Sequence, residues 1–314
     1  MQYGKLFGID KKASKIIYGC AVERMLNGED CDELLSAVFS RGVTLFDTAR
    51  VYGKSEYSLG RWLERQARKE IIVQTKCCHF DENGPRVGRA QAFYDIQTSL
   101  DALKTDYVDA LLLHRDNERV DVSEIVDFMN EIVEKGYAKV IGVSNWTAER
   151  VAQANEYAKA NGLQSFTIMS PYYGLAEQFG SVYLDGTHLT GKAKEKEREW
   201  YKKADISVLA YSSLANGFFS GKYKSNDVKS MEDVPKLKRG YAYPDNFERL
   251  RRAEIMASEK GVTVAQIALA WLLCDEMDTY AIVGCRTEKS LESSIKACDI
   301  FLTQSERAWL NLEQ

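Results

Sequence analysis

The sequence lacks the features that divide a chain into domains or direct it to a membrane. Only four of its 314 residues are proline, and no linker-like or low-complexity stretch interrupts it, so we expect one domain over residues 1–314. No run of about 18 apolar residues occurs, which argues against a membrane span. Residues 1–5 also lack the apolar core of a signal peptide.

Paired cysteines and an excess of charge are also missing. The seven cysteines are odd in number and show no paired spacing, so we expect free thiols and a reducing, cytoplasmic setting. Cys77 and Cys78 stand beside His79 without the two-residue gap of typical zinc ligands, so no metal site is expected. The net charge of −4 gives no electrostatic case for binding nucleic acid or an anionic membrane.

Apolar strand-like segments alternate with amphipathic helix-like segments along the chain. The strand-like segments are residues 15–20, 43–46, 71–74, 108–113, 139–143, 166–169, 206–210 and 280–283. The helix-like segments are residues 30–40, 55–67, 89–103, 122–135, 148–160, 192–203, 264–273 and 288–298. Apolar strands between helices predict a buried parallel sheet, and eight such units predict a closed (β/α)8 TIM barrel. An open doubly wound sheet would need a Gly-x-Gly-x-x-Gly turn after a strand, and none occurs.

Three segments fall outside this alternation. Residues 1–12 precede the first strand and predict a hairpin that closes the bottom of the barrel. Residues 216–243 form a long, polar and basic connection, which we interpret as a loop and candidate lid. Residues 245–260 predict an extra helix.

Polar side chains follow three consecutive predicted strands. Asp47 ends the strand at residues 43–46 with Tyr52 five residues later, Lys76 follows residues 71–74, and His114 follows residues 108–113. Active sites of such barrels lie at the carboxyl ends of the strands, so these side chains are expected to converge.

The four side chains suit proton donation to a carbonyl oxygen. A tyrosine has a pKa of about 10, and the Lys76 cation is expected to lower the pKa of Tyr52. Asp47 would hold Lys76, and His114 would position the carbonyl oxygen for Tyr52 as general acid. None of these groups supplies a hydride, so a nicotinamide cofactor is required.

The same residues carry a resemblance to a known family. One segment resembles the first signature of the aldo-keto reductases, Asp47-Thr48-Ala49-x-x-Tyr52-Gly53-x-Ser55-Glu56-x-x-Leu59-Gly60, and Lys76 and His114 match the rest of the catalytic tetrad. The match spans roughly residues 7–298. It implies an NADPH-dependent oxidoreductase that reduces an aldehyde or ketone to an alcohol.

The resemblance also implies a set of contacts to NADP(H). They are Ser144, Asn145, Ser170, Tyr211, Ser212, Ser213, Leu214, Gly217, Lys222, Gly284, Arg286, Thr287, Ser290 and Ser294. Arg286 precedes a predicted helix start and offers a planar fork for a 2′-phosphate, which favours NADPH over NADH.

Three of these positions depart from the family's usual residues. Ser170 stands where a glutamine usually contacts the nicotinamide carboxamide, and Ser294 stands where an asparagine usually contacts adenine, a role that Glu292 is a candidate to take over. Ser213 replaces a proline, which is expected to loosen its turn.

Polar residues near the catalytic group indicate the class of substrate. Arg50, Arg115 and Tyr172 are predicted to contact it, which favours a polar, sugar-like or anionic carbonyl compound. The alternative is that both arginines pair with Asp116 or Glu118 at the rim, as exposed ion pairs commonly do.

Two other functions remain compatible with these residues. Some aldo-keto reductase-like proteins bind NADPH and attach to membrane channels, so an NADPH sensor with little turnover is one alternative. A barrel isomerase or epimerase that uses Lys76 and Asp47 as proton shuttles is the other, although it leaves Tyr211 and Arg286 without a purpose.

Overall fold

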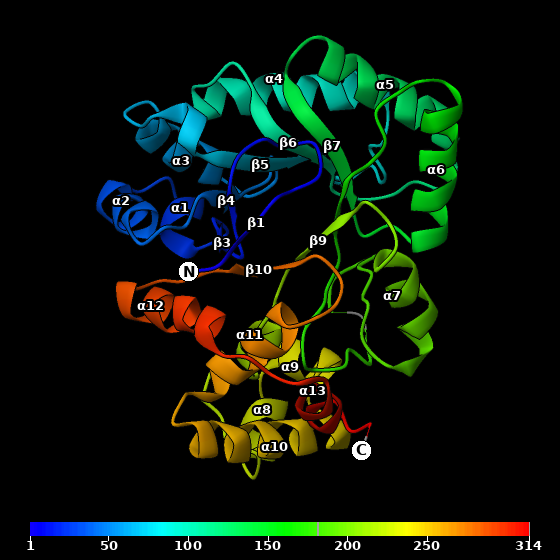
Figure 1. Ribbon diagram of the computed structural model, residues 1–314. Helices are drawn as coiled ribbons and strands as arrows, with labels where there is room; N and C mark the ends of the chain where they lie inside the picture. The colour runs from blue at the N-terminus through cyan, green and yellow to red at the C-terminus, as the bar shows by residue number, and fades with distance from the viewer. Residues whose placement is uncertain (181, 314) are drawn as a thin grey trace.

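The computed structural model describes residues 1–180 and 182–313, and its centre is a closed barrel of parallel strands (Figure 1). Around the barrel these strands are β3 (Ile16–Gly19), β4 (Leu45–Asp47), β5 (Ile72–Cys77), β6 (Val108–Leu113), β7 (Ala138–Ser144), β8 (Ile168–Ser170), β9 (Ser207–Ala210) and β10 (Thr279–Val283). Strand β10 pairs in parallel with β3 and closes the ring. The predicted (β/α)8 barrel is confirmed.

Helices form the layer outside the strands (Figure 1). They are α2 (Asp32–Ser40), α3 (Ser55–Leu63), α4 (Arg89–Leu103), α5 (Val122–Glu134), α6 (Ala148–Ala160), α7 (Glu195–Tyr201), α11 (Val264–Leu273) and α12 (Glu288–Lys296). Local sequence sets several of their ends. Thr263 begins α11 with a capping box to Gln266, in which each residue bonds the other's backbone N–H.

The barrel interior and the helix layer bury separate apolar clusters. The interior cluster includes inward side chains of the strands, such as Leu45, Ile72 and Leu112, together with Leu6 and Ile9 from the N-terminal segment. That segment is a hairpin in which β1 (Tyr3–Gly4) pairs antiparallel with β2 (Ala13–Ser14). Its apolar side chains therefore close one end of the barrel, as the sequence predicted.

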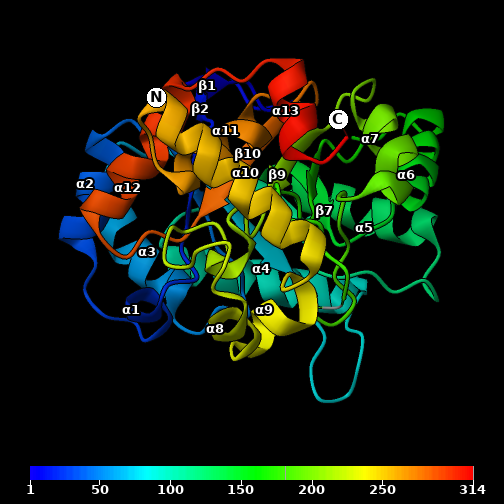
Figure 2. The same ribbon diagram turned by 90° about the horizontal axis from the view of Figure 1, so that it is seen from below.

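Further short helices and 3₁₀ turns lie outside the alternation of barrel strands and surrounding helices. They are α1 (Glu23–Leu26), α8 (Val228–Glu232), α9 (Pro235–Gly240), α10 (Pro244–Lys260) and α13 (Gln304–Leu310), with 3₁₀ turns η1 (Arg68–Glu70), η2 (Lys192–Lys194), η3 (Ala215–Gly217) and η4 (Ala297–Asp299). Figure 2 shows α8 and α9 beside each other near α10. Helix α10 begins at Pro244 and ends before Gly261, whose φ of +65° terminates it.

The interpretation of residues 216–243 as a loop is wrong in part. This segment contains η3 and the two short helices α8 and α9, and it buries Met231, Leu237 and Tyr241. These buried apolar side chains hold the segment against the rest of the molecule. They are few among polar residues, so the composition of the segment did not indicate them.

Two findings concern membranes and metals. Within residues 1–180 and 182–313, no helix has the length and apolarity needed to cross a membrane. Across the same part of the chain, no group of three or more His, Cys, Asp and Glu side chains is arranged to hold a metal ion.

Candidate active site

Three neighbouring strands bring Asp47, Lys76 and His114 together at their carboxyl ends. Asp47 ends β4, Lys76 lies near the end of β5, and His114 directly follows β6. The Lys76 ammonium donates to Asp47 Oδ1, and to the Thr48 carbonyl at 2.9 Å. Both side chains of this ion pair are buried, with 3% of Lys76 and 5% of Asp47 exposed.

Gln74 completes this buried cluster, and sequence reasoning missed it. Its side-chain amide donates to Asp47 Oδ1 at 2.6 Å, so the carboxylate oxygen accepts from both Lys76 and Gln74. In the register of the sheet, Gln74 pairs with Asp47 across β4 and β5. A glutamine two residues before the lysine was the available signal.

Tyr52 reaches the same place from the connection between β4 and α3. Its ring lies 5.1 Å from the Lys76 ammonium and 5.6 Å from the His114 ring, at an interplanar angle of 80°. Gly53 follows with a φ of +52°, and a Cβ there would meet the Leu26 carbonyl at 2.7 Å. Only glycine fits that turn, which holds the phenol against the ion pair.

Burial and neighbouring charges together set the protonation states of Lys76 and Tyr52. Burial by itself lowers the pKa of Lys76, but the Asp47 carboxylate and the Tyr52 hydroxyl together outweigh it and raise the pKa of Lys76 above its ordinary value. Burial raises the pKa of Tyr52, and the opposing effect of the Lys76 cation does not cancel it. Lys76 thus acts on the pKa of Tyr52 in the direction that the sequence predicted, but burial outweighs it, so the phenol is a protonated donor.

His114 is held neutral. Burial, followed by the positive charges of Lys76 and Arg115, lowers its pKa well below the ordinary value for histidine. Only 6% of the residue is exposed, and Nδ1 has no hydrogen-bond partner in the described part of the chain. The ring of His79 packs 4.7 Å from it. A neutral imidazole beside a protonated phenol can orient an oxygen atom that is to receive a proton.

The polar residues at the ends of β7 and β8 bond mainly to one another. Ser144 donates to the Ser170 carbonyl at 2.8 Å, and the Ser170 hydroxyl donates to the Leu209 carbonyl at 2.8 Å. Ser170 is fully buried, so its hydroxyl belongs to the barrel wall. The Asn145 amide donates to the His114 carbonyl at 3.2 Å, which ties this candidate cofactor residue to the catalytic strand end.

The turn after β9 is fastened, in contrast to the expectation for Ser213. Its hydroxyl lies 3.0 Å from the carbonyl oxygens of both Ala210 and Ile282, and the residue is buried. Ser212 has a φ of +52° and Gly217 a φ of +93°, which turn the backbone tightly around Leu214. The serine hydroxyl thus bridges β9 and β10, and the turn is not loosened. Lys222 lies exposed beyond this turn.

The segment after β10 presents an exposed helix N-terminus. Thr287 caps α12 through a box with Ser290, and the exposed Arg286 precedes it after Gly284. Across residues 1–180 and 182–313, no ion pair involves Arg286. Ser294 donates to the Ser290 carbonyl at 3.0 Å within the same helix.

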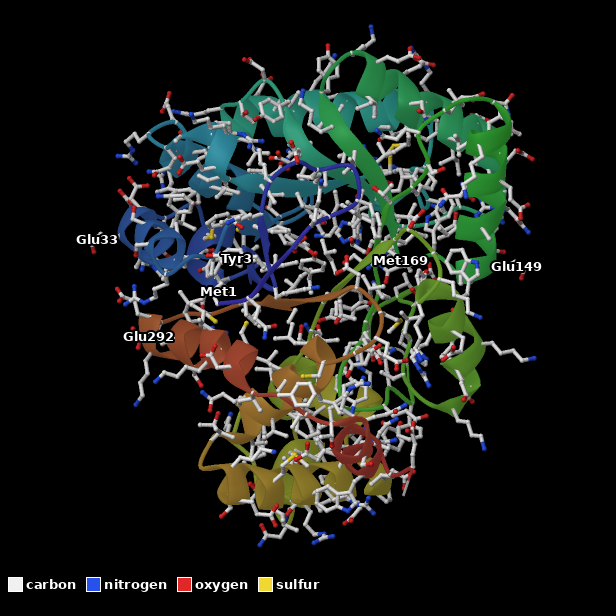
Figure 3. The ribbon with its side chains drawn as sticks, in the orientation of Figure 1. Met1, Tyr3, Glu33, Glu149, Met169 and Glu292 are labelled. Atoms are coloured by element: carbon white, nitrogen blue, oxygen red, sulfur yellow. The ribbon has the colours of Figure 1, made fainter. Side chains whose placement is uncertain are left out.

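The role of Glu292 as a replacement contact to adenine stays a prediction. Its carboxylate accepts from Arg41, which directly follows α2, at 3.0 Å, and Figure 3 shows Glu292 at the outer edge of the molecule. Its carboxylate therefore joins α12 to α2.

Sequence reasoning missed the segment of residues 182–188, which we call the strap. The Thr187 backbone N–H donates to Asn145 Oδ1 at 3.2 Å, and the Tyr211 hydroxyl donates to the same oxygen at 2.9 Å. Tyr183 packs edge-on against Tyr211, with ring centroids 5.8 Å apart, and its hydroxyl donates to Asn216 at 3.0 Å. The strap thus holds polar atoms that the resemblance assigns to the cofactor. No motif or periodicity signals it.

The predicted substrate residues differ in their surroundings. Arg50 pairs with the buried Glu56 at 3.4 Å and borders a cavity of about 300 Å³ together with His79. Tyr172 is fully buried and donates to the Ala176 carbonyl at 2.8 Å, which does not favour a contact to substrate. Arg115 is buried beside His114 and forms no ion pair within the described residues.

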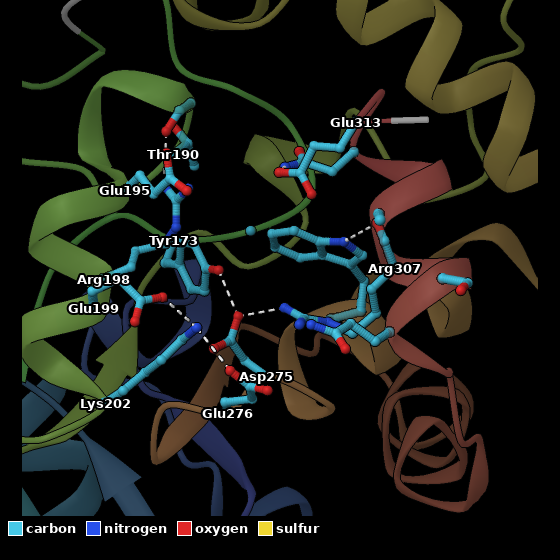
Figure 4. A pocket seen from close by; sticks show the side chains of 17 residues that line it. Tyr173, Thr190, Glu195, Arg198, Glu199, Lys202, Asp275, Glu276, Arg307 and Glu313 are labelled. Carbon is cyan, nitrogen blue, oxygen red and sulfur yellow. Dashed lines mark hydrogen bonds and ion pairs between the residues drawn. The ribbon is translucent and has the colours of Figure 1, made fainter.

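A further cavity of about 400 Å³ lies between α7, α11 and α13, away from the four catalytic candidates (Figure 4). Several of its charged side chains pair with one another: Arg307 binds Asp275, and Lys202 lies 2.7 Å from Glu276. The Tyr173 hydroxyl donates to the same Asp275 at 2.7 Å. Because these side chains bind one another, this cavity does not resemble the site of Asp47, Tyr52, Lys76 and His114.

Comparisons with known proteins agree with the fold. The model of the aldo/keto reductase family matches residues 15–311. A versiconal hemiacetal acetate reductase of Aspergillus parasiticus is 26% identical over 99% of this chain and 96% of its own length. A probable voltage-gated potassium channel subunit beta of Oryza sativa subsp. japonica is 26% identical over 96% of this chain and 92% of its own.

A solved structure supports the fold alone. A thermostable aldo-keto reductase, crystallised with the inhibitor epalrestat, superposes with a TM-score of 0.75 and 22% identity over 100% of both chains. Since the family match extends over residues 15–311, nearly the whole barrel, the chain belongs to the aldo/keto reductase family.

Proposed function

We propose that the protein is an NADPH-dependent reductase of small polar aldehydes or ketones. Membership of the family supports an oxidoreductase that acts on carbonyl groups, and the family generally uses NAD(P)H. The observation that carries the proposal is the buried Lys76–Asp47 pair beside Tyr52, with a neutral His114 facing the same phenol.

The chain's own residues fit a dinucleotide at two places. At the nicotinamide end, the Tyr211 ring and the Asn145 amide lie near the catalytic strand ends, under the strap. At the adenosine end, Arg286 is exposed beside the start of α12. A reduced nicotinamide dinucleotide, when bound, supplies the hydride that the side chains lack.

Tyr52 delivers the proton in this proposal. Its hydroxyl is protonated because burial raises its pKa, and the neighbouring Lys76 cation stabilises the phenolate that remains after the proton leaves. The neutral His114 donates its N–H to the carbonyl oxygen and orients it toward the phenol. Asp47 keeps Lys76 charged and in place, so it acts as a positioning residue.

Arg286 supports NADPH over NADH. A guanidinium offers several donors in a planar fork, which suits a 2′-phosphate, and the helix N-terminus beside it also favours an anion. In this proposal Thr287 and Ser290 form the rim of that phosphate site, and Gly217 and Lys222 also contact the dinucleotide.

A second function is an NADPH sensor with little turnover. Two of the relatives are named as probable potassium channel beta subunits, from Oryza sativa and Arabidopsis thaliana, at 26% identity each. The strap supports this alternative, because it holds Asn145 and Tyr211 where the cofactor would contact them.

Turnover with a panel of carbonyl compounds tests the two functions against each other. NADPH oxidation is followed at 340 nm with neutral, hydroxylated and anionic aldehydes, and NADPH binding is measured separately by fluorescence. Turnover on any group of the panel supports the reductase. Tight NADPH binding without turnover on every compound would favour the sensor.

A further inference from the structure

Arg115 is a buried cation at the edge of the catalytic cluster that forms no ion pair within the described residues. Only 8% of the residue is exposed. Within residues 1–180 and 182–313 no carboxylate forms an ion pair with it, and the one hydrogen bond of its guanidinium is the donation from Nη1 to the His114 carbonyl at 3.3 Å. Nε is buried and has no partner. Burying a charge and leaving a donor unpaired are both costly, so the arrangement calls for a ligand.

The acidic side chains on the same loop do not fill this need. Asp116, the next residue, is bound by Arg150 at 2.7 Å, and Glu118 is exposed. Arg50, the other arginine near the site, already pairs with Glu56. The rim pairing that the sequence left open is therefore absent for Arg115, and its donors remain uncommitted.

We propose that Arg115 is the receptor for an anionic group, a carboxylate or a phosphate, on the carbonyl substrate. This inference rests on the proposed reductase and narrows its polar substrates to those that carry a negative charge. The carbonyl carbon and the anionic group then lie on one small molecule, between Tyr52 and Arg115.

The guanidinium is held in place before any ligand arrives. Its carbon lies 5.5 Å from the centre of the Phe80 ring, and the Trp146 indole N–H donates to the Arg115 carbonyl at 3.5 Å. Nη1 donates to the His114 carbonyl, whereas Nε has no partner within the described residues and remains a donor for an anion. A planar, preorganised fork of this kind suits two oxygens of one anion.

The surrounding charges favour an anion at this place. Lys76 is compensated by Asp47, and both His79 and His114 have pKa values lowered by burial and by the charge of Arg115, so they are neutral at physiological pH. The charge of the exposed Asp185 in the strap also acts on Arg115, but no ion pair joins the two in the described part of the chain. The buried groups next to the carbonyl position therefore carry a net positive charge. The charge of Arg115 also lowers the pKa of Tyr52, which agrees with their proximity.

Matched pairs of substrates test the proposal. The anionic probes are 4-oxobutanoate and glyceraldehyde 3-phosphate, and their neutral counterparts are methyl 4-oxobutanoate and glyceraldehyde. We expect the wild type to prefer at least one anionic probe, and Arg115→Met to lower kcat/KM for that probe by about 30-fold or more, mainly through KM. The neutral counterparts should change by less than about threefold. Whether Arg115→Met lowers kcat/KM for 4-oxobutanoate or for glyceraldehyde 3-phosphate shows whether the anionic group is a carboxylate or a phosphate.

Matched variants separate charge recognition from structure. Arg119→Met removes an exposed arginine from the same loop and should leave the preference intact. Arg115→Lys keeps the charge but loses the fork, so it should recover part of the loss. Urea unfolding checks that Arg115→Met is folded: we expect one cooperative transition with a midpoint close to that of the wild type.

The results that overturn the proposal are distinct from failure of the proposed function. An equal loss on anionic and neutral probes would mean that Arg115 only positions His114. No anionic preference in the wild type, or weaker NADPH binding by Arg115→Met without substrate, would also overturn it. If no carbonyl compound is reduced at all, the thermal unfolding midpoint with and without succinate still tests the proposal. Succinate should raise the midpoint of the wild type but not that of Arg115→Met, and an equal rise in both would reject the proposal.

Discussion

The buried pair of Asp47 and Lys76 should be strongly coupled in stability. We consider Lys76→Met, Asp47→Leu and the double variant. Each single variant leaves one charge in a site where 5% or less of either side chain is exposed. Asp47 would keep its bond from Gln74, and Lys76 would keep its bond to the Thr48 carbonyl and the nearby Tyr52 hydroxyl, but neither would keep an opposite charge. Each single variant is therefore expected to lower the free energy of unfolding. The double variant, which removes both charges, is expected to lower it by less than the two single variants combined.

The size of these effects follows from the burial of the pair. Removing one partner of a buried ion pair costs about 3 to 5 kcal/mol, whereas replacing both by apolar side chains of similar volume is close to neutral. We expect each single variant to lose about 3 kcal/mol in the free energy of unfolding. The loss in the double variant should be at least about 2 kcal/mol smaller than the sum of the two single losses.

Urea unfolding followed by tryptophan fluorescence measures these free energies, since the chain has five tryptophans. The pH dependence adds a second check. Because the pKa of Lys76 is raised, the stability from the pair is fully present below the unfolded pKa of about 10.4 and is lost as pH rises through the folded pKa. The wild type should then lose more stability than the double variant above about pH 10.5. Additive costs within about 0.5 kcal/mol would refute the coupled pair.

Three further predictions follow from individual residues. Because burial lowers the pKa of His114, the unfolded state binds a proton at a higher pH than the folded state does. The free energy of unfolding should therefore fall as pH drops below about 6.5, by at most about 1.4 kcal/mol per pH unit. His114→Gln should flatten this slope in urea unfolding, and an unchanged slope would contradict the prediction. Arg286→Ala should reduce the NADPH-to-NADH ratio of kcat/KM by about tenfold or more; a ratio equal to that of the wild type would remove Arg286 from the phosphate site. Tyr183→Ala should speed NADPH association in stopped-flow fluorescence, because the strap loses its contacts to Tyr211 and Asn216; unchanged association would show that the strap does not cover the cofactor site.

Much of the fold could be predicted because periodicity is local information. Apolar strands and amphipathic helices in regular alternation specify a parallel barrel, and topology then forces the carboxyl ends of β4, β5 and β6 to one place. Asp47, Lys76 and His114 could therefore be grouped without any contact being visible in the sequence.

The remaining features depend on contacts between distant residues. The strap carries no motif, and it reaches the site only through bonds to Asn145 and Tyr211. Helices α8 and α9 are short and polar in composition, so their buried side chains could not be distinguished from a loop. The protonation of Tyr52 is a balance between burial and the Lys76 charge, which depends on how deeply the fold buries the phenol.

The most direct test of the account is Tyr52→Phe, which removes one hydroxyl and keeps the ring that packs against His114. With a carbonyl compound that the wild type reduces, we predict that kcat falls by about 100- to 10,000-fold while the Kd for NADPH changes by less than about threefold. Turnover that survives in Tyr52→Phe within about fivefold of the wild type would contradict Tyr52 as the proton donor.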